Sequence, residues 1–476
     1  MNPSFDATAS KPSTVNPRSA PGPKGVPFFG SVFSAWRNPL RLMVEAHEQY
    51  GDIVRFKFGP YNYYLVNAPD ILRHVLLDNA KAYTKSRSYL GLKVLLGNGL
   101  LTSEGELWRR QRKLAQPAFH RAQLSGLAAT MSRATREMLD RWHREELGTH
   151  RAFCVHAEMM RLTYRIVGLT LFSADVDGGA SEVGHALSTA LSWANEQAMS
   201  IIRIPPSVPT PANIRFQRAL KTLDKIVYRL IADRRARAGS RRDYGNDLMG
   251  MLMAAVDDTD ATGMSDRQLR DEVITMVLAG HETTANLLCW TFHLLAKHPE
   301  IEQRVREEAR RVLGDRDPKF EDVRALQYTK SVLEETLRLY PPAWIFERQT
   351  TEADVLGGYS VPAGSIVAAC PYVLHRHPRY WEQPSKFDPD RFRPELAENR
   401  PRYTYLPFSG GARTCIGNHF AMMEAQIILA MIVREDQLRL ETGHPVELAP
   451  EITLRPKYGI RVRRRPADDA VSALAS

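Results

Sequence analysis

Cysteine is scarce in this chain, and its scarcity excludes several kinds of site. Four cysteines occur in 476 residues, and no two of them form a Cys-x-x-Cys pair, so a zinc site or a dithiol redox site is not indicated. So few cysteines at such wide spacing are typical of a reducing compartment. We therefore expect a cytoplasmic protein whose cysteines are Cys154, Cys289, Cys370 and Cys415.

Long hydrophobic runs are also missing near the start of the chain. The first 20 residues are rich in Ser, Thr, Pro and Asn. They contain neither the apolar core of a signal peptide nor the run of ~20 apolar residues that a membrane anchor needs. We interpret residues 1–20 as a disordered tail on a soluble protein without a membrane anchor.

The chain has no internal repeat and no long linker rich in Pro, Gly or Ser. Length alone would suggest about three domains of ~150 residues. Hydrophobic residues make up 43% and charged residues 25% of the sequence, which is ordinary for a globular protein with a sizeable core. Without a recognisable boundary, a single large domain is the simpler expectation.

The net charge of +10 is spread over several basic runs. A basic surface can bind nucleic acid, but these runs lack interleaved aromatic residues and belong to no nucleic-acid-binding module, so we expect no nucleic-acid partner. The runs at 234–242 and 463–465 are interpreted as solvated faces. The run at 109–113 lies in a helical segment that carries other signals.

A single cysteine stands between glycines in the stretch from Pro407 to Gly417, directly before an apolar segment. A helix that begins there points free backbone N–H groups and a partial positive charge toward Cys415. Arg413 lies two residues upstream, so both features favour an ionised thiolate. Cys415 is therefore predicted to be a ligand or a nucleophile. A buried cysteine in a glycine turn is the alternative from these residues alone.

This stretch resembles the haem-binding loop of the cytochrome P450 family, whose pattern is Phe-x-x-Gly-x-Arg-x-Cys-x-Gly. The resemblance implies a haem b cofactor, iron protoporphyrin IX, with Cys415 as the metal ligand. In this family the axial thiolate favours cleavage of the O–O bond. It further implies that the phenylalanine shields the sulfur and that the glycines let the backbone approach the macrocycle closely. The matching positions are Phe408, Gly411, Arg413, Cys415 and Gly417.

Trp108 and Arg112 lie four residues apart in a helical segment and so share one face. They match the family's Trp-x-x-x-Arg, and the resemblance assigns both to a haem propionate, which needs charge-assisted hydrogen bonds when it is half buried. Arg348 matches a position that pairs with a propionate in relatives. An amphipathic surface helix is the alternative for the segment around Trp108.

A long helix is predicted from a capping box at Ser265 to Lys297, about 48 Å in length. Its centre resembles the family's Ala/Gly-Gly-x-Asp/Glu-Thr-Thr/Ser. The resemblance implies that Glu282 and Thr283 are a catalytic acid–alcohol pair for proton delivery. It also assigns Ala279 and Gly280 to the haem site, where Gly280 lets the helix bend or approach the haem. The zinc-protease motif His-Glu-x-x-His is excluded because position 285 is alanine.

Glu335 and Arg338 match the family's Glu-x-x-Arg, and Arg391 matches its second arginine. A carboxylate shared by two guanidinium groups can hold the loop that carries the cysteine, so the resemblance implies a structural role. Shorter elements are a helix at 39–49, a hairpin at 52–66, a proline-broken loop at 204–211 and a terminal hairpin formed by 452–455 and 459–463.

The fold class implied is mainly α with a small β-rich lobe, the cytochrome P450 fold. The lobe is expected from residues 51–66, 356–370 and 450–463, within one catalytic domain at 21–465 that is followed by a tail at 466–476. The function implied is a haem-thiolate monooxygenase that inserts one oxygen atom of O₂ into an apolar terpenoid, steroid, fatty-acid or polyketide substrate. Electrons are expected from a separate ferredoxin, flavodoxin or flavin reductase, because no fused reductase segment is recognisable.

Two other functions remain open at this point. A haem-thiolate isomerase, dehydratase or peroxide-driven oxygenase would commonly lack the acid–alcohol pair, whereas Glu282 and Thr283 are present here. A haem-binding gas sensor would need no such pair and would be expected to carry an effector domain.

Overall fold

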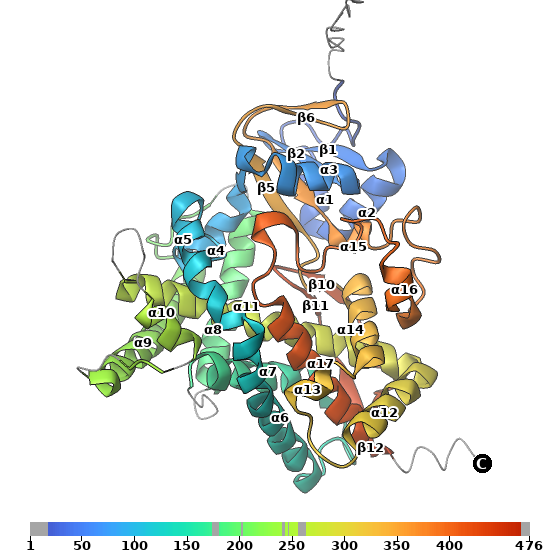
Figure 1. Cartoon of the computed structure of the whole chain (residues 1–476). Helices are drawn as coiled ribbons and strands as arrows, with labels where there is room; N and C mark the ends of the chain where they lie inside the picture. Colours follow the sequence, from blue (N-terminus) through green and yellow to red (C-terminus); the bar gives the residue numbers. More distant parts are fainter. Residues whose placement is uncertain are drawn as a thin grey trace, which may run out of the picture.

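The computed structural model describes residues 18–173, 180–200, 203–239, 243–245, 247–255 and 263–467. Helices dominate, and a β-rich lobe lies at one end of the molecule (Figure 1). The predicted fold class, mainly α with a small β lobe, is confirmed. Most of the two predicted tails lies outside the described residues. Where the tails are described, Arg18 pairs with Tyr359 and Pro466 pairs with Asp436, so these residues belong to the folded unit.

The helices and strands have the following bounds in the described part of the chain. The helices are α1 (Val32–Arg37), α2 (Pro39–Tyr50), α3 (Pro69–Arg73), α4 (Leu90–Leu96), α5 (Gly105–Ala115), α6 (Arg121–Arg144), α7 (Val155–Leu171), α8 (Ala180–Met199), α9 (Pro211–Ala238), α10 (Leu248–Ala254), α11 (Asp266–Lys297), α12 (Pro299–Leu313), α13 (Phe320–Val323), α14 (Gln327–Leu339), α15 (Pro371–Leu374), α16 (Pro394–Ala397) and α17 (Asn418–Glu435). The strands are β1 (Ile53–Phe58), β2 (Tyr61–Val66), β3 (Tyr83–Lys85), β4 (Phe153–Cys154), β5 (Phe346–Thr350), β6 (Asp354–Leu356), β7 (Tyr359–Val361), β8 (Ile366–Ala369), β9 (Asp436–Leu440), β10 (Leu448–Pro450), β11 (Leu454–Pro456) and β12 (Arg461–Pro466).

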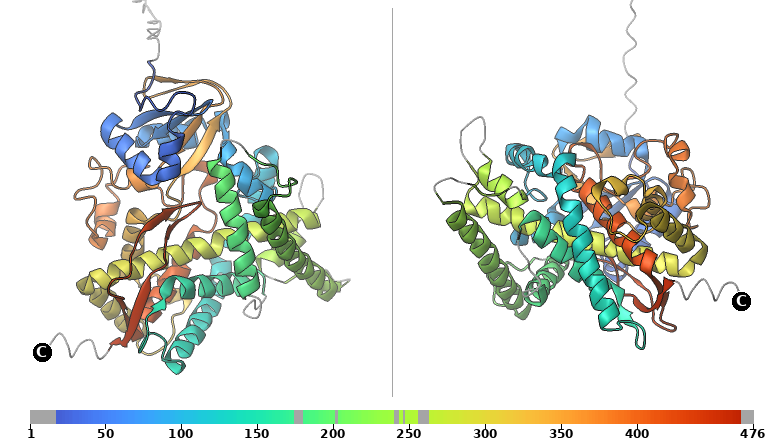
Figure 2. Two further views of the ribbon diagram at one scale, coloured as in Figure 1. Left: turned by 180° about the vertical axis from the view of Figure 1, so that it is seen from behind. Right: turned by 60° about the horizontal axis from the view of Figure 1, so that its bottom comes forward.

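Helix α11 runs through the middle of the helical part, as its yellow-green ribbon shows in the left view of Figure 2. The predicted capping box is present, because the Ser265 hydroxyl accepts from the Gln268 N–H and the Gln268 side chain accepts from the Ser265 N–H. The helix contacts α7, α9, α14 and α17. Most of its length is buried on all sides, but Ala279 and Thr283 at its centre remain accessible. The predicted long helix is thus the axis of the core.

The main sheet has the strand order β1-β2-β8-β5-β3. Successive side chains of β2 point to opposite faces, so Tyr63 and Leu65 pack in the core on the α2 side, while Tyr64 and Val66 pack in the core on the other side. The predicted hairpin is confirmed as the antiparallel pair β1 and β2.

The predicted terminal hairpin is wrong. Strand β11 pairs with β10, whereas β12 pairs with β9 and β4 in a separate sheet. Residues 450–463 therefore do not belong to the main sheet of the β lobe. The reason is burial: Val462 and Arg464 alternate with exposed arginines along β12, and pairing with β9 buries that inner face against the helical core.

The buried pair Glu335 and Arg338 ties α14 to the chain that leads to the cysteine. Arg338 binds Glu335 bidentately at 2.6 and 2.7 Å, and it also donates to the carbonyls of His375, Pro384 and Lys386. The Nε of Arg391 lies 3.5 Å from Glu335 and completes the expected trio as an ion pair, without a second bidentate contact.

His375 connects the Glu335–Arg338 pair to the cysteine loop. Its Nε2 accepts a hydrogen bond of 2.8 Å from the backbone N–H of Leu406, the residue just before the cysteine loop. Burial, and then the positive charges of Arg338 and Arg376, lower the pKa of His375 to about 3, so the ring stays neutral and can accept. The position of the cysteine loop thus depends on the buried ion pair through one histidine.

We predict that Glu335→Ala destabilises the protein by about 3–5 kcal/mol, because Arg338 would be left as an unpaired buried charge. Lys330→Ala is the matched control on the same helix, since its exposed pair with Glu334 is worth about 0–1 kcal/mol. Denaturant unfolding of both variants gives the two values. Equal stabilities would contradict the structural role of Glu335.

Candidate active site

The cysteine loop is held by its own backbone and by a close contact with the segment His74–Asp78. The N–H of Cys415 donates to the carbonyl of Phe408 at 3.0 Å, and Gly411 has a left-handed φ of 67°. A Cβ on Gly411 would lie 1.9 Å from the carbonyl oxygen of Leu76. Gly411 is therefore required by packing against this segment. A Cβ on Gly417, in contrast, would meet only Phe119, at 3.7 Å.

Cys415 is exposed, although enough protein lies around its thiol to desolvate it. Burial raises the pKa of Cys415, while a hydrogen bond from Gly417 and the positive charge of Arg112 act in the opposite direction. The helix N-terminus therefore reaches the sulfur as predicted. The expected cation is different, because Arg112 supports the thiolate whereas Arg413 pairs with Glu104 at 2.5 Å.

Helix α5 presents its predicted face to the cysteine loop. Arg112 donates to the carbonyl of Thr414 at 2.9 Å. The guanidinium of Arg413 lies 4.0 Å above the Trp108 ring and also donates to the carbonyl of Ser103. Trp108, Arg112 and Arg413 are thus brought together, and the sequence spacing had placed the first two correctly.

Positive charge accumulates beside this loop. Lys85 on β3 and Arg348 on β5 are direct partners across the antiparallel pairing. Burial lowers the pKa of Lys85 well below its usual range, and the charges of Arg348 and Arg413 lower it further, while the charge of Glu104 acts in the opposite direction. Like charges opposite each other on a sheet are unfavourable, so this arrangement suits a bound anion. Sequence reasoning missed Lys85, although its place in Lys85-Ser86-Arg87 was a usable signal.

These residues fit the haem that the sequence resemblance implies. A haem needs an axial ligand for its iron and cations for its two propionate carboxylates. Cys415 offers an accessible thiol, Lys85 and Arg112 offer half-buried cations, and Arg348 offers a buried one.

The residues at the centre of α11 lie on different sides of the helix. Ala279 and Thr283 are on an accessible side, and the Thr283 hydroxyl donates to the Ala279 carbonyl at 2.7 Å. A Cβ on Gly280 would lie 3.0 Å from Val167 of α7. Gly280 therefore permits close packing of α7 on α11. The haem contact that the resemblance implies for Gly280 stays a prediction.

Glu282 is buried and ends a chain of hydrogen bonds that sequence reasoning missed. The Thr453 hydroxyl donates to Glu282 Oε1 at 2.5 Å, and Asn286 Nδ2 donates to Thr453 at 3.1 Å. His156 Nε2 lies 2.9 Å from Asn286 Oδ1. Burial lowers the pKa of His156 to about 4, so the neutral ring donates to the amide. Each of these three hydrogen bonds is therefore donated in the direction of Glu282. The Oε2 atom of Glu282 has no protein partner among the described residues.

A second buried acid approaches α11 from α17. Burial raises the pKa of Glu424 well above its usual range, and the nearby Thr284 hydroxyl only partly offsets this effect. Burial thus favours the neutral form of Glu424. The signal in the sequence was an acidic residue in the middle of a largely apolar helix, apart from Glu435 at its end.

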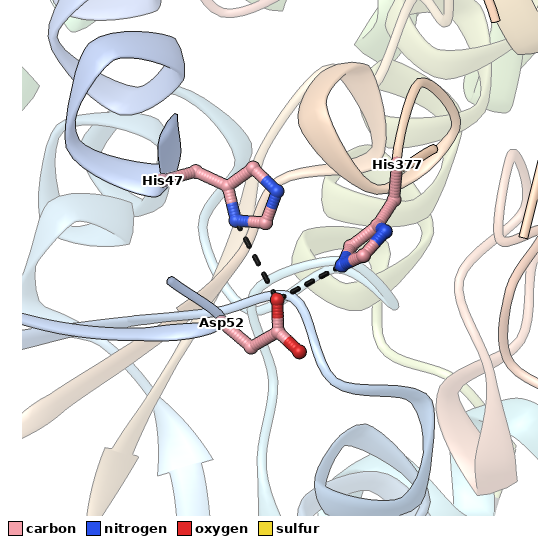
Figure 3. A group of neighbouring side chains, drawn as sticks. All are labelled: His47, Asp52 and His377. Atoms are coloured by element: carbon pink, nitrogen blue, oxygen red, sulfur yellow. Dashed lines mark hydrogen bonds and ion pairs between the residues drawn. The ribbon is translucent and has the colours of Figure 1, made fainter. Parts of the chain in front are cut away.

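One further group of metal-ligating side chains lies together in the described part of the chain, namely His47, Asp52 and His377 (Figure 3). The Arg379 N–H donates to Nδ1 of His377, so Nε2 holds the ring proton and donates it to Asp52 Oδ1 at 2.9 Å. Nδ1 of His47 donates to the carbonyl of Gly51 at 3.2 Å. A metal ion would need lone pairs on both of these nitrogens. We interpret the group as a hydrogen-bonded link between α2, the start of β1 and the segment after α15.

Comparison with known proteins identifies a matching family model, Cytochrome P450, over residues 20–462. Cyclooctatin synthase from Streptomyces melanosporofaciens is 39% identical over 94% of this chain and 96% of its own length. Cyclooctat-9-en-7-ol 5-monooxygenase from the same organism is 37% identical over 89% of this chain and 90% of its own. Pentalenene oxygenase from Streptomyces avermitilis is 35% identical over 90% and 94%. Among the described residues, no helix has the length and apolar character needed to cross a membrane.

We predict that Gly411→Ala lowers the free energy of unfolding by at least about 2 kcal/mol, because its Cβ would strike the Leu76 carbonyl in a left-handed backbone. Gly417→Ala is the matched control, since its backbone φ of −93° suits alanine and its contact is ordinary. Equal unfolding free energies for the two variants would contradict the packing role of Gly411.

Proposed function

Because the chain belongs to the cytochrome P450 family, we propose that the site described above oxidises a cyclic terpenoid. The chain is a haem-thiolate monooxygenase, an oxidoreductase that inserts one oxygen atom of O₂ into an apolar organic substrate with electrons from a redox partner. Two of its relatives are named for oxidising pentalenene and cyclooctat-9-en-7-ol. Their similarity over most of both chains supports a terpenoid over a steroid, fatty acid or polyketide.

The observation that carries the site assignment is the accessible Cys415 thiol next to an excess of enclosed cations. We assign haem b to this place, with Cys415 as the iron ligand, and with Trp108, Arg112 and Arg348 beside the propionates. Lys85 joins them because the paired charges of Lys85 and Arg348 need a counter-anion. Phe408, Gly411, Arg413 and Gly417 shape the loop. When bound, the haem with its thiolate ligand supplies the activation of dioxygen.

The residues at the centre of α11 control protons and water at the proposed haem site. Ala279 and Thr283 line its accessible side, where the Thr283 hydroxyl can turn from the Ala279 carbonyl toward a bound group. Glu282 supplies the acid, because its Oε1 is fixed by Thr453 while its Oε2 is free of protein partners. Directional donors in a dry site orient a carboxylate for proton transfer. Asn286 and His156 are positioning residues that keep the Thr453 hydroxyl aimed at Glu282.

The electron donor is proposed to be a ferredoxin, flavodoxin or flavin reductase that docks on α5. Arg109 and Lys113 are exposed there and border an open hollow of about 430 Å³ that also includes Trp108 and Arg112. Exposed cations near the cysteine loop steer an acidic partner to it. A cytoplasmic location is proposed because all four cysteines are free.

The carbon monoxide spectrum tests the thiolate assignment. Reduced holoenzyme with carbon monoxide should show the strongly red-shifted Soret band of thiolate ligation, and Cys415→His should abolish that band. Cys154→Ser is the matched control at a second accessible cysteine and should leave it unchanged. A spectrum typical of histidine ligation in the folded wild-type protein would contradict the assignment. Substrate-induced spectral titration with pentalenene and with a fatty acid of equal carbon number then separates the proposed substrate classes.

We predict that Thr283→Ala slows product formation about a hundredfold while haem content and substrate affinity are unchanged, because proton delivery fails. Thr453→Val should cause a smaller loss of about tenfold, since it removes one hydrogen bond to the Glu282 carboxyl group. Thr453→Ser retains the hydroxyl and should restore the rate. The measurement is product formed per NAD(P)H consumed, with peroxide determined in parallel. Unchanged coupling in both Thr283→Ala and Thr453→Val would refute these roles.

A further inference from the structure

Five large apolar side chains near the start of the chain are exposed together, and we call them the N-terminal apolar patch. They lie in the turn before α1 and on α1 itself. The Phe29 and Phe33 rings are 5.3 Å apart, and the Phe33 and Trp36 rings are 5.9 Å apart. The exposed fractions are 49% for Val26, 96% for Phe28, 48% for Phe29, 49% for Phe33 and 54% for Trp36.

The patch is held on a fixed part of the fold. Val26 and Gly30 exchange two backbone hydrogen bonds of 2.8 and 2.7 Å, and Ser31 donates to the Lys57 carbonyl of β1 at 2.8 Å. A Cβ on Gly30 would lie 2.0 Å from that same carbonyl, so the turn sits directly on the strand. The aromatic rings are therefore presented by an anchored turn and a helix.

Phe28 occupies a backbone conformation that suits glycine better than phenylalanine. Its φ is 64°, in the left-handed region that side chains with a Cβ rarely adopt. Its ring is almost fully exposed and contributes nothing to the core. Neither backbone preference nor packing explains a phenylalanine here, so the ring is expected to contact something outside the molecule.

The charged residues of the segment that carries the patch have one sign. No Asp or Glu occurs between Asp6 and Glu45 in the sequence. Lys24, Arg37 and Lys57 border the patch and are exposed. Among the described residues none of these three has an acid within ion-pair distance. Exposed aromatics with basic neighbours are the combination that favours the interface of an anionic bilayer.

We propose that the N-terminal apolar patch binds the surface of an anionic lipid bilayer. The aromatic rings enter the boundary between headgroups and acyl chains, and the three cations contact lipid phosphates. The contact is peripheral and reversible, since a few side chains of one turn and one short helix enter the bilayer.

The place of the patch allows this contact to coexist with electron transfer. Figure 1 shows α1 within the β lobe and apart from α5, where the redox partner is proposed to dock. An apolar substrate partitions into bilayers, so the contact would hold the enzyme next to its substrate. The proposal does not depend on the reaction, because binding is measured without turnover.

Flotation of the holoenzyme with vesicles tests the proposal. The protein should float with phosphatidylglycerol vesicles and much less with phosphatidylcholine vesicles. Binding should weaken as the Debye length falls from ~10 Å at 0.1 M to ~3 Å at 1 M salt. The double variant Phe28→Gly, Phe33→Ser should bind at least about tenfold more weakly. The double variant Lys24→Glu, Arg37→Glu should bind phosphatidylglycerol vesicles more weakly and should bind phosphatidylcholine vesicles like the wild type.

Leu396→Ser on α16 is the matched control, because Leu396 is 58% exposed and lies outside the patch. It should bind like the wild type. Phe28→Gly relieves the left-handed backbone, so its melting temperature and carbon monoxide spectrum should match those of the wild type and show that the fold is intact. The proposal is overturned if the wild type does not float at low salt or if the patch variants float equally well. It is also overturned if sedimentation shows a dimer for the wild type and a monomer for the patch variants. The patch would then bind a second copy of the chain.

Discussion

The buried ion pair between Glu335 and Arg338 is the constraint on which the position of the cysteine depends. Both side chains are fully buried, so removing them from water is costly, and burial raises the pKa of Glu335 despite the guanidinium beside it. The pair is therefore a poor source of net stability. The role of the pair is to fix geometry, since Arg338 donates hydrogen bonds to three backbone carbonyls of a segment without regular structure. His375 then transmits that fixed position to Leu406 and the cysteine loop.

Features that depend on residues close together in the sequence could be predicted, whereas features that depend on distant residues could not. The bounds of α11, the cysteine loop and the shared face of Trp108 and Arg112 depend on residues a few positions apart, so spacing predicts them. The pairing of β12 with β9 and of Lys85 with Arg348 depends on partners that only the tertiary fold brings together. Gly411 shows the intermediate case, because the need for glycine was recognisable whereas its cause, the Leu76 carbonyl, was not.

The hydrogen bonds of Glu282 illustrate the same limit. Glu282 and Asn286 are one turn apart on α11, so their common direction could be read from the sequence. Thr453, which joins them, comes from the connection between β10 and β11 and carries no motif. The acid is thus identified by local pattern, while its orientation comes from a loop far away in the chain.

The sequence at the centre of α11 also weakens the helix where the proposed proton donors lie. The side chains of His281, Thr283 and Thr284 each bond to a carbonyl four residues earlier. Thr163 of α7 adds a hydrogen bond to the carbonyl of His281. Side chains that bond to helix carbonyls compete with the backbone ladder and allow local bending. Packing of α7 against Gly280 limits where such a bend can occur. The central helix is therefore rigid over most of its length and adaptable at the turn that carries Ala279 and Thr283.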